Sequence, residues 1–183
     1  MSSWKRLKRE TVLDTKFIKV FNDHVQLPSG HIMDDYSVVS LPSGVVIVAT
    51  DLEGKLITMH EYKYAVDKTI LTLPAGSIEE GEDPLEVAAK ELLEETGYTS
   101  NDMKLVQEAY EYPSKLSHSQ FIVRARNARK SSVVKHEASE DISPVGLISA
   151  DMDDYGGEFD SMYNIAALAL TLPEYLERQK LKD

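Results

Sequence analysis

The sequence contains no cysteine among its 183 residues. This absence excludes disulfides, thiol nucleophiles and cysteine-ligated zinc, and it is typical of proteins in a reducing cytoplasm. The chain also lacks any apolar run of the roughly 18 to 20 residues that are needed to cross a bilayer. Residues 1–6 lack the apolar core of a signal peptide. We therefore expect a cytoplasmic protein that has no membrane association.

Positive charge is also scarce in this chain. Its 20 lysines and arginines stand against 31 aspartates and glutamates, which gives a formal net charge of −11. This balance argues against a nucleic-acid partner, because phosphate backbones demand clustered lysine and arginine. The basic cluster of Lys5, Arg6, Lys8 and Arg9 is more typical of a solvated strand or terminus. An acidic protein can still bind phosphates when a metal ion supplies the positive charge, so we expect a small-molecule partner.

Strands and tight turns dominate the first half of the chain. Residues 16–26 and 31–41 have an extended pattern, and a Leu-Pro-Ser-Gly turn separates them. The β-branched run at 45–50 and residues 55–62 predict a hairpin, joined by a turn that contains Gly54. At this length the chain can build one well-buried core, and it leaves too few residues for a second independent domain.

The second half mixes helices with strands. The predicted elements are a helix over 83–96, strands over 103–111 and 120–125, an exposed loop over 127–141, and a final helix over 161–178 that Pro173 divides. Strands flanked by helices, without regular βαβ alternation, predict an α+β fold of the αβα-sandwich type with a mixed central sheet.

The helix over 83–96 carries the clearest chemical signal. Asp83-Pro84 supplies an N-cap and a proline at the first helical position, and Gly97 ends the helix. On a helical wheel the apolar side consists of Leu85, Ala88, Ala89 and Leu92, which we expect to pack against the sheet.

Three glutamates, Glu91, Glu94 and Glu95, gather on another side of the same helix. Three like charges so close together repel one another, and a cation among them would remove that penalty. Magnesium suits such a site, because it prefers oxygen ligands and retains waters that substrate phosphates can replace. The alternative is that the three carboxylates form a merely solvated helical face.

The surroundings of these glutamates resemble the Nudix box. That motif is a glycine, five residues, glutamate, seven residues, then Arg-Glu-φ-x-Glu-Glu-x-Gly-φ, in which φ is apolar. Residues 76–98 match every defining position except one, since Lys90 replaces the arginine. In the family that arginine pairs with a box glutamate, and lysine keeps the charge but loses the planar two-pronged donor. The supporting positions of the motif are Gly76, Glu82, Lys90 and Gly97.

This resemblance implies a Nudix αβα sandwich over residues 43–183 and an N-terminal antiparallel strand extension over residues 1–42. It also implies a Mg²⁺-dependent hydrolase, with Mn²⁺ as a substitute metal, that cleaves the diphosphate bridge of a nucleoside diphosphate linked to another moiety. The metal ligands implied are Glu91, Glu94, Glu95 and the backbone carbonyl of Ala75. The general base would be Glu140, because Glu140-Asp141-Ile142 resembles the corresponding family segment, although a solvated acidic loop is the alternative.

Further features are similar to the ADP-ribose pyrophosphatase branch of that family. Leu73-Pro74-Ala75-Gly76 resembles its entry into the box, and Lys63 stands where that branch often has arginine. Pro113 lies 15 residues beyond the box, a spacing that marks ADP-ribose hydrolases, although a lone proline can also simply end a strand. By the same resemblance, Phe17 and Tyr36 could stack on the base, or they could serve as core or interface packing. The early strands of that branch form intertwined homodimers.

The segment after Pro113 departs from that branch. The branch commonly continues with Ser-Pro-Gly and an acidic pair, whereas residues 114–120 have neither the glycine nor the acids. His118, in this segment, is more typical of an ordinary surface or loop residue, and a substrate contact is the alternative. ADP-ribose, cleaved to AMP and ribose 5-phosphate, is therefore the first of several candidates. The alternatives are another nucleotide sugar, a dinucleoside polyphosphate, or a Nudix-fold module that binds a nucleotide metabolite without cleaving it.

Overall fold

The computed structural model describes residues 3–131, 146–148 and 159–172 of the chain. The chain divides into two compact units, which are described separately. Unit 1 consists of residues 1–43 and 110–119, and unit 2 consists of residues 44–109 and 120–183. No helix in the described part of the chain is long and apolar enough to cross a membrane.

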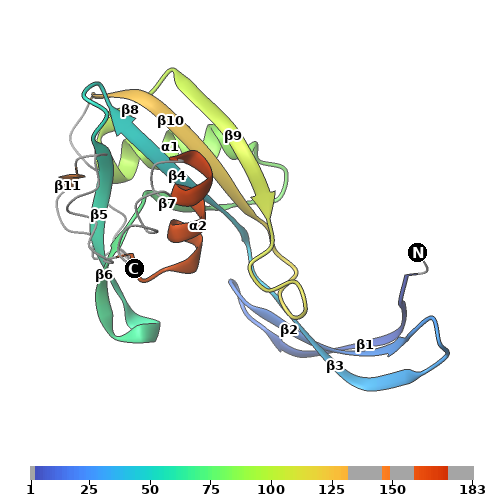
Figure 1. Cartoon of the computed structure of the whole chain (residues 1–183). Coiled ribbons are helices and arrows are strands. Elements are labelled where there is room, and N and C mark those ends of the chain that lie inside the picture. Colours follow the sequence, from blue (N-terminus) through green and yellow to red (C-terminus); the bar gives the residue numbers. More distant parts are fainter. Residues whose placement is uncertain (1–2, 132–145, 149–158, 173–183) are drawn as a thin grey trace, which may run out of the picture. The chain divides into compact units, whose positions relative to one another are not determined.

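Unit 1 contains a three-stranded antiparallel sheet (Figure 1). Its strands are β1 (Lys5–Asp14), β2 (Lys19–Gln26) and β3 (Ile32–Ser40), and they pair in chain order. Short turns connect the strands, so consecutive strands pair directly. The extended pattern predicted for residues 16–26 and 31–41 is confirmed over 19–26 and 32–40, whereas residues 16–18 belong to the turn between β1 and β2.

The sheet of unit 1 buries very little of itself. All ten residues of β1 are exposed. Within this sheet only Asp23 and Val25, both on β2, are buried. Asp23 is 4% exposed and accepts two hydrogen bonds, 2.7 and 2.6 Å long, from the guanidinium of Arg9 on the exposed strand β1. The hydrogen bonds from Arg9 lower the pKa of Asp23, against the opposing effect of its burial. Large apolar side chains such as Val12 and Phe17 remain in contact with solvent, 67% and 64% exposed.

Unit 2 is built around an eight-stranded mixed sheet and two helices. The strands are β4 (Ser43–Asp51), β5 (Leu56–Lys63), β6 (Lys68–Thr72), β7 (Ala75–Ile78), β8 (Tyr98–Thr99), β9 (Asp102–Ala109), β10 (Gln120–Lys130) and β11 (Gly146–Ile148). The helices are α1 (Pro84–Thr96) and α2 (Met162–Thr171), with a short 3₁₀ turn, η1 (Tyr64–Val66), between β5 and β6. Strand β10 runs parallel to β4, whereas β8 and β9 pair with β10 in the antiparallel sense.

Strand β4 contributes side chains to two hydrophobic clusters. Val46 and Val48 belong to the cluster that includes Leu168 of α2. The alternate residues, of which Ile47 is fully buried, belong to the cluster that includes Leu92 of α1. Because successive side chains of a strand point to opposite faces, the sheet carries one helix on each face. The predicted αβα sandwich with a mixed sheet is therefore confirmed.

The predicted hairpin over 45–50 and 55–62 is present as β4 and β5. Its turn is fixed by the carboxylate of Asp51, which accepts hydrogen bonds of 2.9 and 2.8 Å from the backbone N–H groups of Glu53 and Lys55. Gly54 adopts a φ of 78°, which a residue with a side chain rarely reaches. The local turn chemistry of these four residues thus sets the connection.

Two expectations require correction. Strand β10 continues to Lys130, so residues 127–130 are not part of a loop, because a bulge at Asn127 lets the ladder resume. Ala89 is exposed whereas Val87 is buried, because the buried face of α1 contains Val87 and Ala88 but not Ala89. Strands β6, β7, β8 and β11 were not predicted. The predicted loop beyond residue 131 and the final helix beyond residue 172 lie outside the described residues.

Candidate active site

Both ends of α1 are fixed by local interactions. The side chain of Asp83 accepts hydrogen bonds of 2.9 and 3.2 Å from the backbone N–H groups of Leu85 and Glu86. At the other end Gly97 has a φ of 73°, and its N–H donates to the carbonyl of Leu93 at 2.9 Å. These caps satisfy the groups that a helix leaves unpaired at its ends. They therefore set which residues of the sequence form the helix, as predicted.

Glu95, in the last turn of α1, is the most enclosed carboxylate of the helix. It is only 4% exposed, and its Oε2 accepts a 2.9 Å hydrogen bond from the backbone N–H of Ala75. Ala75 is the first residue of β7, so this bond joins the helix to the strand before it. A carboxylate that is removed from water needs such partners to keep its charge. The strand thereby fixes where this negative charge lies.

Gly76 lies directly against the side chain of Glu91. A Cβ atom at position 76 would stand 2.4 Å from both Cγ and Cδ of Glu91, closer than any real carbon contact. The requirement for glycine here is thus one of space and not of backbone conformation. The absence of a side chain at Gly76 allows the backbone of β7 to lie beside Glu91.

Lys90 contacts two of the three glutamates. Its Nζ lies 3.7 Å from an oxygen of Glu91 and 3.5 Å from an oxygen of Glu94. The lysine side chain is 59% exposed, so these ion pairs are screened and each stabilises the helix by well under about 1 kcal/mol. Lysine at this position still offsets the repulsion between neighbouring carboxylates. As a point charge it does not fix both groups at once, as a planar guanidinium would.

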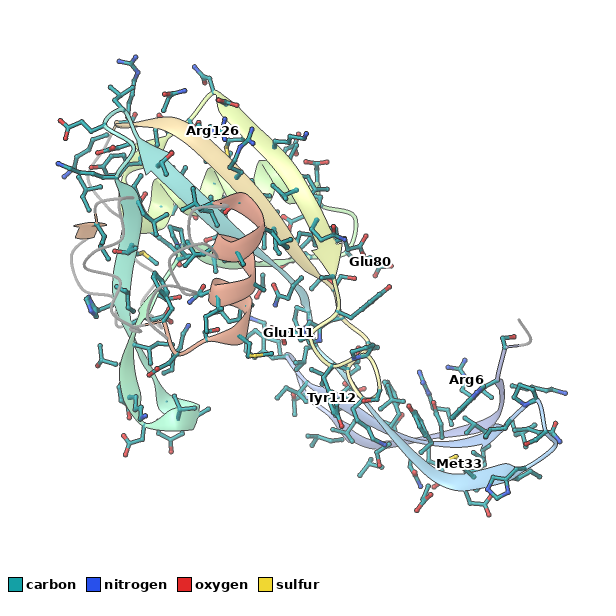
Figure 2. The ribbon with its side chains drawn as sticks, viewed as in Figure 1. Arg6, Met33, Glu80, Glu111, Tyr112 and Arg126 are labelled. Carbon is teal, nitrogen blue, oxygen red and sulfur yellow. The ribbon has the colours of Figure 1, made fainter. Side chains whose placement is uncertain are left out.

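Glu82 closes the loop that precedes α1. The backbone N–H of Glu79 donates to Oε2 of Glu82 at 2.8 Å, and the N–H of Glu82 donates to the carbonyl of Glu79 at 3.2 Å. Gly81 between them has a φ of 91°. This compact turn brings the chain from β7 into the first turn of the helix, so Glu82 lies at the loop-helix junction. Figure 2 labels the neighbouring Glu80 in the same loop.

The chemistry of these donors can be tested against a divalent metal. Among the described residues, no three histidine, aspartate or glutamate side chains already converge on one metal position. What the site offers is three carboxylates on one helix, next to strand backbone at Ala75 and Gly76. Hard oxygen donors that leave coordination positions open fit Mg²⁺, which keeps several waters or phosphate oxygens as ligands. The residues therefore fit such an ion.

Two of the predicted substrate-binding residues, Tyr36 and Pro113, line one cavity of about 380 Å³ in unit 1. The hydroxyl of Tyr36 donates a 2.6 Å hydrogen bond to the carbonyl of Ser114. The ammonium of Lys115 lies 4.3 Å from the centre of the Tyr36 ring, and the Trp4 ring meets it edge-on with 5.6 Å between ring centres. The position of the Tyr36 ring is thus fixed from several sides, and one of its faces is covered by a cation.

The other predicted substrate-binding residues, Phe17 and Lys63, do not line this cavity. Phe17 is 64% exposed and does not line that cavity, and the ammonium of Lys16 lies 4.8 Å from its ring centre. In unit 2, Nζ of Lys63 lies 2.5 Å from Oε1 of Glu61, and Lys63 lines a different cavity of about 720 Å³. Glu140 lies outside the described residues.

His118 lies in a loop, as predicted, but it is buried, which corrects the expectation of a surface residue. It is 5% exposed, and its Nε2 lies 3.3 Å from Oε2 of Glu111, so the pair joins the two ends of the segment from Tyr110 to Ser119. Figure 2 labels Glu111 in this segment. Sequence reasoning missed the pair because a lone histidine has no local pattern that identifies a partner seven positions away.

The family of the chain follows from its sequence as well as from this geometry. Residues 40–155 match the family model described as NUDIX domain, and residues 4–39 match the one described as nucleoside diphosphate sugar hydrolase N-terminal domain. The chain therefore belongs to the Nudix family, as its box predicted. Nudix enzymes generally use divalent metal ions, which agrees with the oxygen donors of α1.

Individual relatives support the same family. The chain is 33% identical over 109 residues to an ADP-ribose pyrophosphatase of Bacillus subtilis (strain 168), a match that covers 60% of this chain and 58% of the relative. It is 35% identical over 100 residues to a methanol dehydrogenase activator of Bacillus methanolicus, covering 55% and 54% of the two chains. These matches span somewhat more than half the length of each relative.

A solved structure extends the likeness to the whole fold. The crystal structure of an ADP compounds hydrolase superposes with a TM-score of 0.77 and covers 98% of this chain and 97% of its own. The two sequences are 23% identical, so the comparison concerns the fold alone.

Proposed function

We propose that this chain is a Mg²⁺-dependent hydrolase that cleaves the diphosphate bridge of a nucleoside diphosphate linked to another moiety. The observation that carries this proposal is the hydrogen bond between Ala75 and Glu95, together with the close approach of Gly76 to Glu91. Both contacts join the box helix to the strand before it. A merely solvated helical face would need neither contact.

The ion would be held by Glu91, Glu94, Glu95 and the backbone carbonyl of Ala75. When bound, Mg²⁺ neutralises diphosphate oxygens and lowers the pKa of an attacking water, and Mn²⁺ can take its place. Glu95 keeps its position through the N–H of Ala75, so its charge is oriented before any ion arrives. Preorganised charge of this kind is the main source of rate enhancement in phosphoryl transfer.

Other residues of the chain have supporting or proton-transfer roles in this proposal. Glu82 closes the loop before α1, and Gly97 ends the helix. Lys90 reduces the repulsion between Glu91 and Glu94. Glu140 is the proposed general base that accepts the proton of the attacking water. Water would attack one phosphorus of the bridge, and the oxygen between the two phosphorus atoms would leave with the other product.

ADP-ribose, cleaved to AMP and ribose 5-phosphate, is the proposed first substrate. The similar proteins of Bacillus subtilis and Mycobacterium tuberculosis named ADP-ribose pyrophosphatase support this choice, as does the matched N-terminal domain of nucleoside diphosphate sugar hydrolases. We propose Tyr36 and Pro113, with Phe17 and Lys63, as substrate contacts. Since Lys115 covers one face of Tyr36, we expect this ring to contribute its edge or its other face.

We also propose that the enzyme is a cytoplasmic homodimer, in which residues 1–42 serve dimerisation and substrate contact and residues 43–183 form the catalytic domain. The exposed apolar side chains of unit 1 support the dimer. They are Trp4, Leu7, Val12, Leu13, Phe17, Ile18 and Ile32, all at least 40% exposed. A monomeric protein rarely leaves so many large apolar groups in water on so small a unit. Sedimentation equilibrium, which measures mass independently of shape, tests this assignment.

Activity is tested by incubating the purified protein and Mg²⁺ with ADP-ribose, other nucleotide sugars, dinucleoside polyphosphates and nucleoside triphosphates. Mass spectrometry of products formed in ¹⁸O-labelled water shows which phosphorus atom is attacked. We expect AMP and ribose 5-phosphate from ADP-ribose, and no turnover when EDTA removes the metal. Saturable binding of these compounds without any cleavage would instead establish a non-catalytic binding module.

A further inference from the structure

A second basic segment lies on β10, at the end of the sheet where β8 and β9 pair with it. Residues 124–130 include four positive charges in a chain whose formal net charge is −11. Two of these, Arg126 and Arg129, line one cavity of about 300 Å³. Figure 2 labels Arg126 at this end of the strand. None of the box glutamates lines this cavity.

A β-bulge places both arginines on the same cavity. Residues three apart in a regular strand point to opposite faces of the sheet. Between Ala125 and Ala128 the register with β4 shifts, and Asn127 adopts a φ of 53°. As a result both alanines are buried while Arg126 and Arg129 are exposed. Bulges often re-aim side chains in this way, and left-handed backbone at a residue other than glycine costs stability.

The opposite wall of the cavity comes from the connection between β8 and β9. It contributes Thr99, Asn101 and Asp102. The hydroxyl of Ser100 donates to the carbonyl of Arg126 and accepts a 3.0 Å hydrogen bond from the N–H of Asp102, so the two walls are tied together. The cavity is therefore formed by backbone that strand pairing and side-chain hydrogen bonds hold in place.

Neither arginine forms an ion pair within the part of the chain that the structure describes. Asp102 stands opposite Arg126 in the β9–β10 ladder, yet the two side chains are not paired. Two guanidinium groups at one cavity match the geometry of a phosphate, which accepts bidentate hydrogen bonds from each. The carboxylate of Asp102 would repel a bare anion, but it accepts hydrogen bonds from hydroxyl groups.

We propose that this cavity binds a phosphate monoester that carries hydroxyl groups, such as a sugar phosphate, at a site distinct from the box glutamates. Arg126 and Arg129 bind the phosphate, and Asp102 and Asn101 bind hydroxyls next to it. A small ligand suits a cavity of this size. The overall negative charge of the chain disfavours a long polyanion, whose other phosphates would meet acidic surface. The site does not depend on the proposed hydrolase activity.

The test is isothermal titration calorimetry of the full chain with glucose 6-phosphate, in buffer with EDTA so that no divalent metal is bound. Glucose 6-phosphate is neither a substrate nor a product of the proposed reaction. We expect saturable binding to one site per chain. The Arg126→Gln/Arg129→Gln variant should bind at least about tenfold more weakly, because it loses charge-assisted hydrogen bonds. Inorganic phosphate and glucose should each bind more weakly than glucose 6-phosphate.

A matched control is Lys130→Gln, which removes one charge from the next position of the strand without changing the lining of the cavity. It should keep the wild-type affinity. No saturable binding by the wild type, unchanged affinity in the double variant, or an equal loss in Lys130→Gln would each overturn the proposal.

A second measurement applies if the double variant does not fold, as judged by circular dichroism. Titration of the ¹⁵N-labelled wild type with glucose 6-phosphate should shift the amide signals of residues 99–102 and 126–129. If the signals of other residues shift while the signals of these two segments do not, the proposed site is overturned.

Discussion

The carboxylate of Glu95 accepts a 2.9 Å hydrogen bond from the backbone N–H of Ala75, twenty residues earlier in the chain. This bond connects the last turn of α1 to the first residue of β7. A buried carboxylate held by a backbone donor keeps a defined position, since neither partner can turn freely. The proposed metal site is therefore anchored at the glutamate that is least exposed.

Replacing this carboxylate tests the proposed metal site. Glu95→Gln keeps an oxygen that accepts from the N–H of Ala75, so the fold should survive, but it removes one negative charge. We expect turnover of ADP-ribose with Mg²⁺ to fall by about a hundredfold or more, which corresponds to roughly 2.7 kcal/mol of transition-state stabilisation. Steady-state kinetics measures this loss, and circular dichroism checks the fold. Glu86→Gln, on the exposed first turn, is the matched control, and full activity in Glu95→Gln would contradict the assignment.

Adding one methyl group at Gly76 should disturb Glu91. In Gly76→Ala the new Cβ would stand 2.4 Å from two carbons of that side chain, so the glutamate must move. We expect kcat to fall by at least about tenfold and the free energy of unfolding to fall by about 1–3 kcal/mol, as is usual for overpacking. Urea unfolding and kinetics measure the two effects.

Gly81→Ala separates crowding from backbone strain. Nothing lies within 4 Å of a Cβ at position 81, but the φ of 91° there is strained for alanine. This control should lose stability while changing kcat much less than Gly76→Ala does. Equal losses of kcat in the two variants would argue that the loop, and not Glu91, is responsible.

Removing the charge of Lys90 should make the stability of the chain more dependent on metal. Lys90→Gln leaves Glu91 and Glu94 without the ammonium that lies 3.7 and 3.5 Å from them. In EDTA we expect the free energy of unfolding to fall by about 0.3–1 kcal/mol. Mg²⁺ should then stabilise the variant more than the wild type, because the ion replaces the missing positive charge. Thermal unfolding with and without Mg²⁺ measures this difference.

Two further variants serve as comparisons for Lys90→Gln. Lys104→Gln changes an exposed lysine on β9 and should leave the effect of Mg²⁺ as in the wild type. Lys90→Arg restores the residue of the family motif and should retain wild-type activity within about threefold, since it keeps the charge. An identical Mg²⁺ effect in all three variants would show that Lys90 has no influence on the metal site.

The ion pair of Arg9 and Asp23 should make unit 1 sensitive to acid. Hydrogen bonds from Arg9 lower the pKa of Asp23 in the folded state, so the unfolded chain binds this proton more readily. The resulting stabilisation is fully present above the pKa of the unfolded chain, about 3.9, and is lost as the pH falls through the lower folded pKa.

Arg9→Ala measures this contribution. At pH 7 the variant should be less stable by about 1–3 kcal/mol, because it leaves a buried carboxylate without its charged partner. The difference from the wild type should shrink below about pH 4, as Asp23 becomes protonated in both proteins. Urea unfolding at a series of pH values provides the measurement. A difference that stays constant down to pH 2 would exclude this origin.

Local chemistry in the sequence determined α1 and the turn between β4 and β5. Asp83 and Gly97 cap the helix through groups no more than four residues away, and Asp51 folds the turn through its own neighbours. The spacing of Glu91, Glu94 and Glu95 within one helix is likewise local. Such signals are visible in a single sequence because each acts over less than two helical turns.

The tertiary structure alone decided which groups meet across longer separations. Ala75 lies twenty residues from Glu95, and Tyr36 donates to Ser114 from 78 residues away. The burial of Val87 in place of Ala89 depends on how the helix rests on the sheet. The bulge at Asn127, which extends β10, depends on its partner strands. None of these features has a local signal, because their energies come from packing and pairing between segments that only the folded chain brings together.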